Sequence, residues 1–167
     1  MRRLAAILLV GLAVILQVSL LPALRPFGVV PNLALVVVVL VSMQMVTSEA
    51  VIAAAVSGLV LDLDSGSNFG LWTGVMVLSV LAVAMVQRAG IELDRAFVAP
   101  VLVSAGTLVI SVVIWVSLIP SVSSLPIGNL GGRLAIELVI NLVLTMVMRP
   151  VVRMLIGGGG PQIEPGG

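Results

Sequence analysis

Two groups of charged residues interrupt otherwise apolar stretches of this sequence. The first is Asp62 and Asp64, within the glycine- and serine-containing segment 58–74, and the second is Arg133 and Glu137. Paired carboxylates can hold a metal ion, but side chains two positions apart on a helix point about 200° apart. No further acidic cluster accompanies Asp62 and Asp64, so we predict no metal site there.

The composition excludes most other catalytic chemistry. The chain has no Cys, His, Tyr or Lys, and all eight basic residues are Arg. Zinc sites built on Cys or His, nucleophiles activated by His, and catalytic or phosphate-binding lysines are therefore absent. We predict a non-enzymatic protein with no catalytic residues, no cofactor and no nucleic-acid partner.

The proportion of apolar residues defines the class of protein. Hydrophobic residues make up 60% of the 167 residues and charged residues 9%, and the mean hydropathy is +1.33. Soluble domains have about 45–50% apolar and about 25% charged residues. The chain is therefore expected to be an all-α integral membrane protein whose surroundings are the lipid bilayer.

Six hydrophobic segments are expected to be transmembrane helices, since a span needs about 20 apolar residues. They cover residues 4–21, 33–46, 50–61, 71–86, 97–119 and 134–148, the last extending as far as 156. The first segment has the basic start of a signal peptide, but no A-x-A-like cleavage site follows, so we interpret it as a span. Asn32 is the expected N-cap of the second span. We predict one transmembrane domain, 1–156, and a disordered Gly/Pro-rich cytoplasmic tail, 157–167.

The arginines predict the orientation of these spans. Six spans place both termini on one side, and cytoplasmic termini put six of the eight arginines inside, as the positive-inside rule requires. The six are Arg2, Arg3, Arg88, Arg95, Arg149 and Arg153, which leaves Arg25 and Arg133 outside. Trp72 and Trp115 then lie at the outer interface, where Trp is enriched.

Asp62 is expected to lie at membrane depth. Twelve residues separate it from Ala50, about 18 Å of helix, whereas the hydrocarbon core is about 30 Å thick. A carboxylate at that depth requires a partner, so Asp62 is predicted to face the helix bundle or a second protein. It acts either as a hydrogen-bond anchor of the turn or as a functional group. Asp64 is expected at the wet rim, as N-terminal cap of the next helix.

Small residues recur at every fourth position around Asp62. The series is Ala50, Ala54, Gly58, Asp62, Gly66, Gly70 and Gly74. Spacing of this kind lets helices approach closely, although four-residue steps drift about 40° each on an ideal helix. Two interpretations remain: local helix packing with turn formation, or a partner-binding face that also includes Asp64 and Ser65.

Arg133 and Glu137 are one helical turn apart and are predicted to form an intramembrane polar pair. With Asn141 and Thr145 they form a polar set on the last span. This set either holds helices together or gives Glu137 a proton- or ligand-coupling role. The small polar residues of the fifth span, which include Thr107 and Ser111, are interpreted as ordinary packing residues.

The polar motif resembles a known family. Residues 28–90 carry the resemblance, through Pro31-Asn32-Leu33 and through Gly58-x-x-x-Asp62-x-x-Ser65-Gly66-x-x-x-Gly70. They are similar to the P-[DN]-L and G-x-x-x-D-x-x-S-G-x-x-x-G patterns of the rod shape-determining protein MreD family. Asp64 departs from the pattern, because an apolar residue is usual there, as does the Gly-rich tail.

The resemblance implies a non-enzymatic role in the machinery that elongates rod-shaped bacteria. It implies binding to MreC in the cytoplasmic membrane, and through MreC a link to MreB, RodA and its transpeptidase, which together organise peptidoglycan synthesis. It also implies a six-helix bundle similar to the substrate-binding subunits of energy-coupling-factor transporters. The motif residues would then be architectural or partner-binding.

A vitamin-type carrier subunit of a transporter is the alternative function. Such subunits resemble one another in an A-x-x-x-A pattern on the first helix, and the first span here lacks it. Only five aromatic residues, two Trp and three Phe, are present to stack on a vitamin ring.

Overall fold

The computed structural model describes residues 2–24, 28–66, 69–89, 95–118 and 130–156, and the regular structure in these ranges is entirely α-helical. The helices are α1 (Arg2–Ser19), α2 (Leu21–Leu24), α3 (Leu33–Ser42), α4 (Thr47–Ser65), α5 (Leu71–Arg88), α6 (Arg95–Leu118) and α7 (Leu130–Ile156). The all-α prediction is confirmed. The predicted tail, 157–167, lies outside the described residues.

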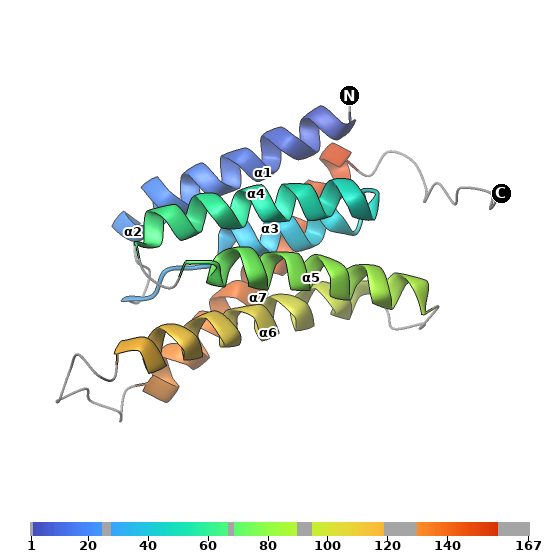
Figure 1. The fold of residues 1–167 in the computed structure, drawn as a ribbon. Helices are drawn as coiled ribbons and strands as arrows, with labels where there is room; N and C mark the ends of the chain where they lie inside the picture. Colours follow the sequence, from blue (N-terminus) through green and yellow to red (C-terminus); the bar gives the residue numbers. More distant parts are fainter. Residues whose placement is uncertain (1, 25–27, 67–68, 90–94, 119–129, 157–167) are drawn as a thin grey trace.

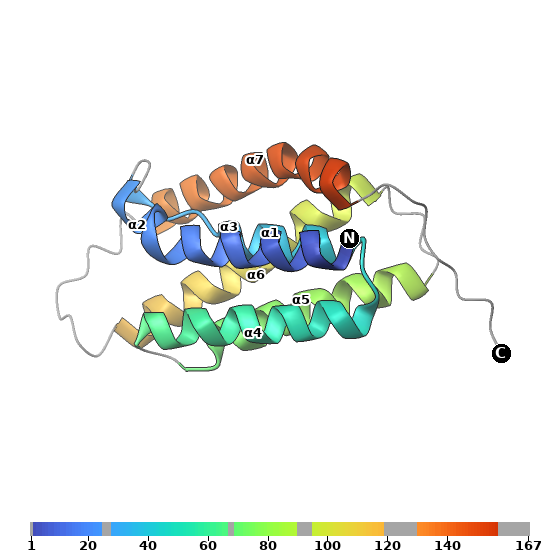
Figure 2. The same ribbon diagram turned by 90° about the horizontal axis from the view of Figure 1, so that it is seen from above.

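The longer helices lie side by side along a common direction, and successive ones run opposite ways (Figures 1 and 2). Helix α2 continues α1, because the backbone N–H of Leu20 still donates to the carbonyl of Leu16 at 3.0 Å. The start of α1 and the end of α7 lie at the same end of the bundle. At this end, Arg3 and Glu49 form a 2.9 Å ion pair that joins α1 to α4.

Four segments of the described chain are long and apolar enough to cross a membrane. They are Arg2–Leu24, Leu71–Arg88, Phe97–Ile114 and Gly131–Ile156, and each corresponds to a predicted span. Helix α3 is shorter, with 10 residues, and ends at Ser42 instead of residue 46. Helix α4 begins at Thr47 and contains three carboxylates along its length.

The third predicted span differs from α4 at its C-terminal end. The predicted span covers residues 50–61, whereas α4 continues through Asp62 and Asp64 to Ser65. Gly66 then ends the helix in the left-handed conformation, with φ of 62°, which glycine adopts without steric cost. The carboxylate of Asp62 accepts hydrogen bonds from α5. Asp62 can therefore remain helical, because its buried charge is satisfied by another helix.

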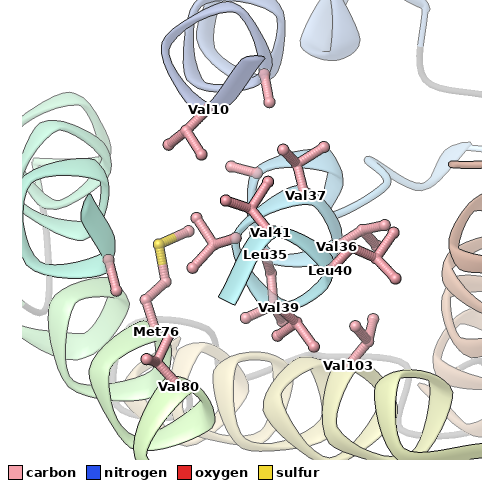
Figure 3. Packing of buried hydrophobic residues seen from close by; sticks show 14 of the residues in the cluster. Val10, Leu35, Val36, Val37, Val39, Leu40, Val41, Met76, Val80 and Val103 are labelled. Carbon is pink, nitrogen blue, oxygen red and sulfur yellow. The ribbon is translucent and has the colours of Figure 1, made fainter. Parts of the chain in front are cut away.

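Helix α3 forms the centre of the bundle. Every residue from Ala34 to Ser42 is buried, and α3 contacts α1, α4, α5, α6 and α7. Figure 3 shows its Val and Leu side chains surrounded by Val10 of α1, Met76 of α5 and Val103 of α6. A helix that is apolar on all sides is typical of a buried position, and the Val-rich run of α3 fits this position.

The outward-facing surfaces of the peripheral helices are apolar. Leu8 on α1, Ile52 on α4 and Met146 on α7 are all well exposed, and many neighbouring large side chains are exposed with them. Lipid tails are as apolar as Leu, so such side chains are satisfied in a bilayer. The molecule is therefore apolar outside, and its polar side chains gather inside.

Candidate functional site

The first polar cluster joins the end of α4 to the start of α5. Asp62 is 1% exposed, and its Oδ1 accepts a hydrogen bond from the backbone N–H of Trp72 at 2.9 Å. Its Oδ2 accepts from both the backbone N–H and the hydroxyl of Thr73, at 3.1 and 2.6 Å. The first N–H groups of any helix lack intrahelical acceptors, so Asp62 caps α5 from the neighbouring helix.

This arrangement corrects the prediction for Asp64. We expected Asp64 to cap the next helix, but its side chain is exposed and accepts no hydrogen bond from any described residue. The N-cap position of α5 is Gly70, with φ of 93° and no side-chain oxygen. The cap must therefore come from outside the local sequence, and Asp62 supplies it with the negative charge that a helix N-terminus favours.

Gly58 lets α4 and α5 approach closely. A Cβ atom on Gly58 would lie 2.4 Å from Cα of Thr73 and 2.9 Å from the carbonyl carbon of Trp72. Those are backbone atoms, so neither can move aside without shifting α5. Gly58 and Asp62, one turn apart on α4, therefore hold the same first turn of α5.

The other glycines of the predicted series have different roles. Gly66 and Gly70 both have positive φ, and a Cβ on either would meet nothing within 4 Å, so they shape the turn and pack against no helix. Gly74 also faces open space. Ser65 donates from Oγ to the carbonyl of Asp62 at 3.0 Å. Residues at this four-residue spacing therefore have different roles: Gly58 allows close packing, Asp62 caps α5, and Gly66 and Gly70 shape the turn.

The second polar cluster surrounds the start of α3, where Asn32 joins α6 and α7. Its backbone N–H donates to Oδ1 of Asn141 at 2.8 Å. Its side-chain Nδ2 donates to Oγ1 of Thr107 at 3.2 Å and to Oε1 of Glu137 at 3.1 Å. We expected Asn32 to cap its own helix, but its side chain makes no capping bond and points to the neighbouring helices instead.

Further bonds complete this cluster. Asn141, which is fully buried, donates from Nδ2 to Thr107 at 3.0 Å, and Ser111 donates to Oε2 of Glu137 at 2.9 Å. From α1, Oε1 of Gln17 accepts from the backbone N–H of Ala34 at 3.4 Å. Side-chain amides of α1 and α7 thus accept hydrogen bonds from the backbone N–H groups of Asn32 and Ala34, two buried residues at the start of α3 where intrahelical acceptors are lacking.

Arg133 and Glu137 do not pair as predicted. The guanidinium of Arg133 donates to the backbone carbonyl of Gly28 at 3.1 Å, and no salt bridge joins it to Glu137 in the described part of the chain. The carboxylate of Glu137 is held by Asn32 and Ser111 instead. Its partners therefore come from other helices and not from the preceding turn.

No role was predicted for Gln17, and the interpretation of Thr107 and Ser111 as ordinary packing residues is wrong, because both form hydrogen bonds to other helices. Each is a polar side chain in an apolar helix, which signals that a partner is needed. Their partners lie 17 to 75 residues away in the chain, so spacing on one helix could not identify them. Among the described residues, no buried side-chain nitrogen or oxygen lacks a hydrogen bond.

A cavity of about 300 Å³ lies beside this cluster. It is bordered by α1, α5, α6, α7 and the segment before α3. The lining residues are Gln17, Gly28, Val29, Val30, Asn32, Trp72, Ile110, Ser111, Ile114, Arg133, Leu134 and Glu137. Across the described ranges, no three Asp or Glu side chains gather closely enough to hold a metal ion.

The fold and these two clusters define a helical, multi-pass membrane protein whose helices are joined by buried polar groups. Within that class, the family model for the rod shape-determining protein MreD matches residues 1–157, and the chain belongs to this family. It is thus a cell-shape protein of the rod machinery, located in the inner membrane. Comparison with curated proteins and with solved structures gives no match.

Proposed function

We propose that this protein is a non-enzymatic scaffold of the elongation machinery, which binds MreC within the membrane. Through MreC it helps MreB, RodA and its transpeptidase to organise peptidoglycan synthesis. The observation that carries this proposal is the family match over residues 1–157.

In this proposal the family motif is architectural. Gly58 and Asp62 hold the first turn of α5, and Gly66 and Gly70 shape the chain between the two helices. The motif would then serve a partner indirectly, by keeping α4 and α5 in one relative position.

The exposed side chains that border this turn are the proposed contact for MreC. Leu63 is 67% exposed and Phe69 is 70% exposed, and Asp64 is exposed between them in sequence. Aromatic side chains, Phe among them, are enriched at protein interfaces. Gly74 also faces open space, which leaves room for a partner helix beside the start of α5.

We further propose that α3 and α4 complete six crossings of the membrane, in a single domain of residues 1–156. Helix α3 is short, but it is enclosed by protein, which is where short or irregular elements are tolerated at membrane depth. The end that holds Arg2, Arg3 and Arg153 is then cytoplasmic. The expected likeness to substrate-binding subunits of energy-coupling-factor transporters stays a prediction.

Co-purification tests the contact with MreC. Tagged protein is co-expressed with MreC, extracted in mild detergent and captured, and the recovered MreC is quantified for wild type, Leu63→Ala and Phe69→Ala. We expect Phe69→Ala to lower MreC recovery by about tenfold, as removal of a central interface side chain does. Leu24→Ala is the matched control, because Leu24 is 62% exposed on α2, outside the α4–α5 turn.

The outcomes separate two claims. Unchanged recovery of MreC with both turn variants would show that MreC binds elsewhere on the bundle. Failure of the wild-type protein to recover MreC, together with failure to restore rod shape in cells depleted of their own MreD, would overturn the proposed function itself.

A further inference from the structure

The cavity beside Asn32 holds two opposite charges apart. Arg133 and Glu137 both line it, and they are one turn apart on α7, a rise of about 6 Å. Each is tied to a different group: Arg133 to the carbonyl of Gly28, and Glu137 to Asn32 and Ser111. The two charged side chains therefore do not pair with each other, and both border the same cavity.

Glu137 retains unused capacity to accept hydrogen bonds. A carboxylate has about four lone-pair sites, and the described residues use two of those on Glu137. A carboxylate in a transmembrane segment is costly without a countercharge. An ammonium group, with three N–H donors, would supply both the missing donors and the positive charge.

Arg133 and Gln17 offer donors to the same space. A guanidinium has five N–H donors and binds carboxylate or phosphate well, and one donor of Arg133 reaches Gly28. Gln17 is only 7% exposed, and its side-chain nitrogen has no hydrogen-bond partner among the described residues. Among the described residues no fully buried side-chain nitrogen lacks a hydrogen bond, so this amide nitrogen is not fully buried. Gln17 also lines the cavity.

We propose that this cavity binds a small zwitterionic group, in which a primary ammonium and a phosphate or carboxylate are separated by a short apolar linker. The ammonium lies against Glu137, and the anionic group lies against Arg133. Trp72, Ile110 and Ile114 line the cavity and cover the linker. The inference does not depend on the proposed binding of MreC.

This group could be a free zwitterion or the head group of an aminophospholipid, and two measurements distinguish these sources. For the free form, thermal unfolding of the detergent-purified protein is followed with O-phosphoethanolamine. Glycerol 3-phosphate, which lacks the ammonium, and phosphocholine, which lacks N–H donors, are the comparison compounds. For the lipid form, native mass spectrometry measures the phosphatidylethanolamine, phosphatidylcholine and phosphatidylglycerol retained by protein released from nanodiscs containing equal amounts of the three.

We expect selective binding of the ethanolamine compound in one of these measurements. A higher unfolding midpoint with O-phosphoethanolamine alone indicates a free zwitterion, because binding to the folded state stabilises it. Selective retention of phosphatidylethanolamine alone indicates the lipid. Glu137→Gln and Arg133→Gln should each weaken the selective binding by about tenfold, as loss of a charge-assisted bond does.

Two features of the design keep the result interpretable. Arg153→Gln is the matched control, since Arg153 is an exposed arginine near the opposite end of α7 and should bind as wild type does. Arg133 is also exposed, so its replacement should leave the fold intact even if Glu137→Gln does not fold. Equal responses to all three compounds or lipids, no response, or undiminished binding of the ethanolamine compound by a folded Arg133→Gln protein would each overturn the proposal.

Discussion

Asp62 illustrates how a single side chain can serve two elements. It belongs to α4, but the three hydrogen bonds that its carboxylate accepts come from Trp72 and Thr73 of α5. Of the two interpretations that the sequence left open, these bonds match the hydrogen-bond anchor. A role for Asp62 toward a partner would have to act through the position of α5, because Asp62 is only 1% exposed.

Replacing Asp62 with Asn should destabilise the protein by about 1–3 kcal/mol. The amide keeps one acceptor oxygen, but its NH₂ group cannot accept from the N–H groups of α5, and the negative charge at the helix N-terminus is lost. Thermal or denaturant unfolding in detergent measures the change. Asp64→Asn is the control, expected within about 0.5 kcal/mol because Asp64 is exposed. Equal effects of the two substitutions would contradict the assignment of Asp62 as the cap.

At the scale of helices, two different devices bring elements together. Helices α4 and α5 meet closely because Gly58 has no side chain, whereas α3 is joined to α6 and α7 by the amide side chains of Asn32 and Asn141. Close packing at Gly58 requires that no side chain be present, whereas the hydrogen bonds of Asn32 and Asn141 require a specific polar partner. Helix α3 needs such partners, because Asn32 and Ala34 at its start are buried and their N–H groups lack intrahelical acceptors.

Gly58→Ala should separate α4 from α5 and destabilise the protein by about 1–3 kcal/mol, as overpacking does. The added methyl would lie 2.4 Å from Cα of Thr73, a distance that requires the backbone to move. Gly74→Ala is the matched control: it is also helical and faces open space, so Ala should be neutral or stabilising by about 0.5–1 kcal/mol. Unfolding midpoints of the two variants provide the measurement, and a Gly58→Ala protein as stable as wild type would refute close packing at this point.

For the whole molecule, the direction of the helices and the arginines together predict a topology. Val46 lies before the start of α4 and Phe69 lies after its end, and both are well exposed. The start of α4, which follows Val46, lies at the same end of the bundle as the start of α1, where Arg3 and Glu49 form an ion pair (Figure 1). If that end is cytoplasmic, as the positive-inside rule indicates, the α4–α5 turn faces the outside.

Single cysteines test this topology, because the natural chain has no Cys to interfere. In intact spheroplasts, a membrane-impermeant maleimide should label Phe69→Cys and leave Val46→Cys unlabelled until the membrane is permeabilised. The wild-type chain is the control and should remain unlabelled throughout. The opposite labelling pattern would mean that the termini are outside, and labelling of both positions in intact spheroplasts would exclude a membrane crossing by α4.

Much of the fold follows from the local sequence. Apolar segments predicted the helices, and α3 and α5 begin at Leu33 and Leu71, the first residues of the corresponding predicted spans. The free energy of transferring an apolar segment into the membrane depends on the residues of that segment and not on where other segments lie. The end of α4 could not be predicted in this way, because Asp62 is stabilised by α5 and not by its own neighbours.

The sequence by itself determined that the chain is a helical membrane protein with a motif of the MreD family. It also identified the residues that must have partners, since polar groups in lipid cannot remain unpaired. Only the tertiary structure decided which residues those partners are. Glu137 is held by Asn32 and Ser111 and not by Arg133, because hydrogen bonds depend on distances between helices that are far apart in the chain. The same distances leave Arg133 and Glu137 on one cavity, where a pair predicted from one helix becomes a proposed binding site.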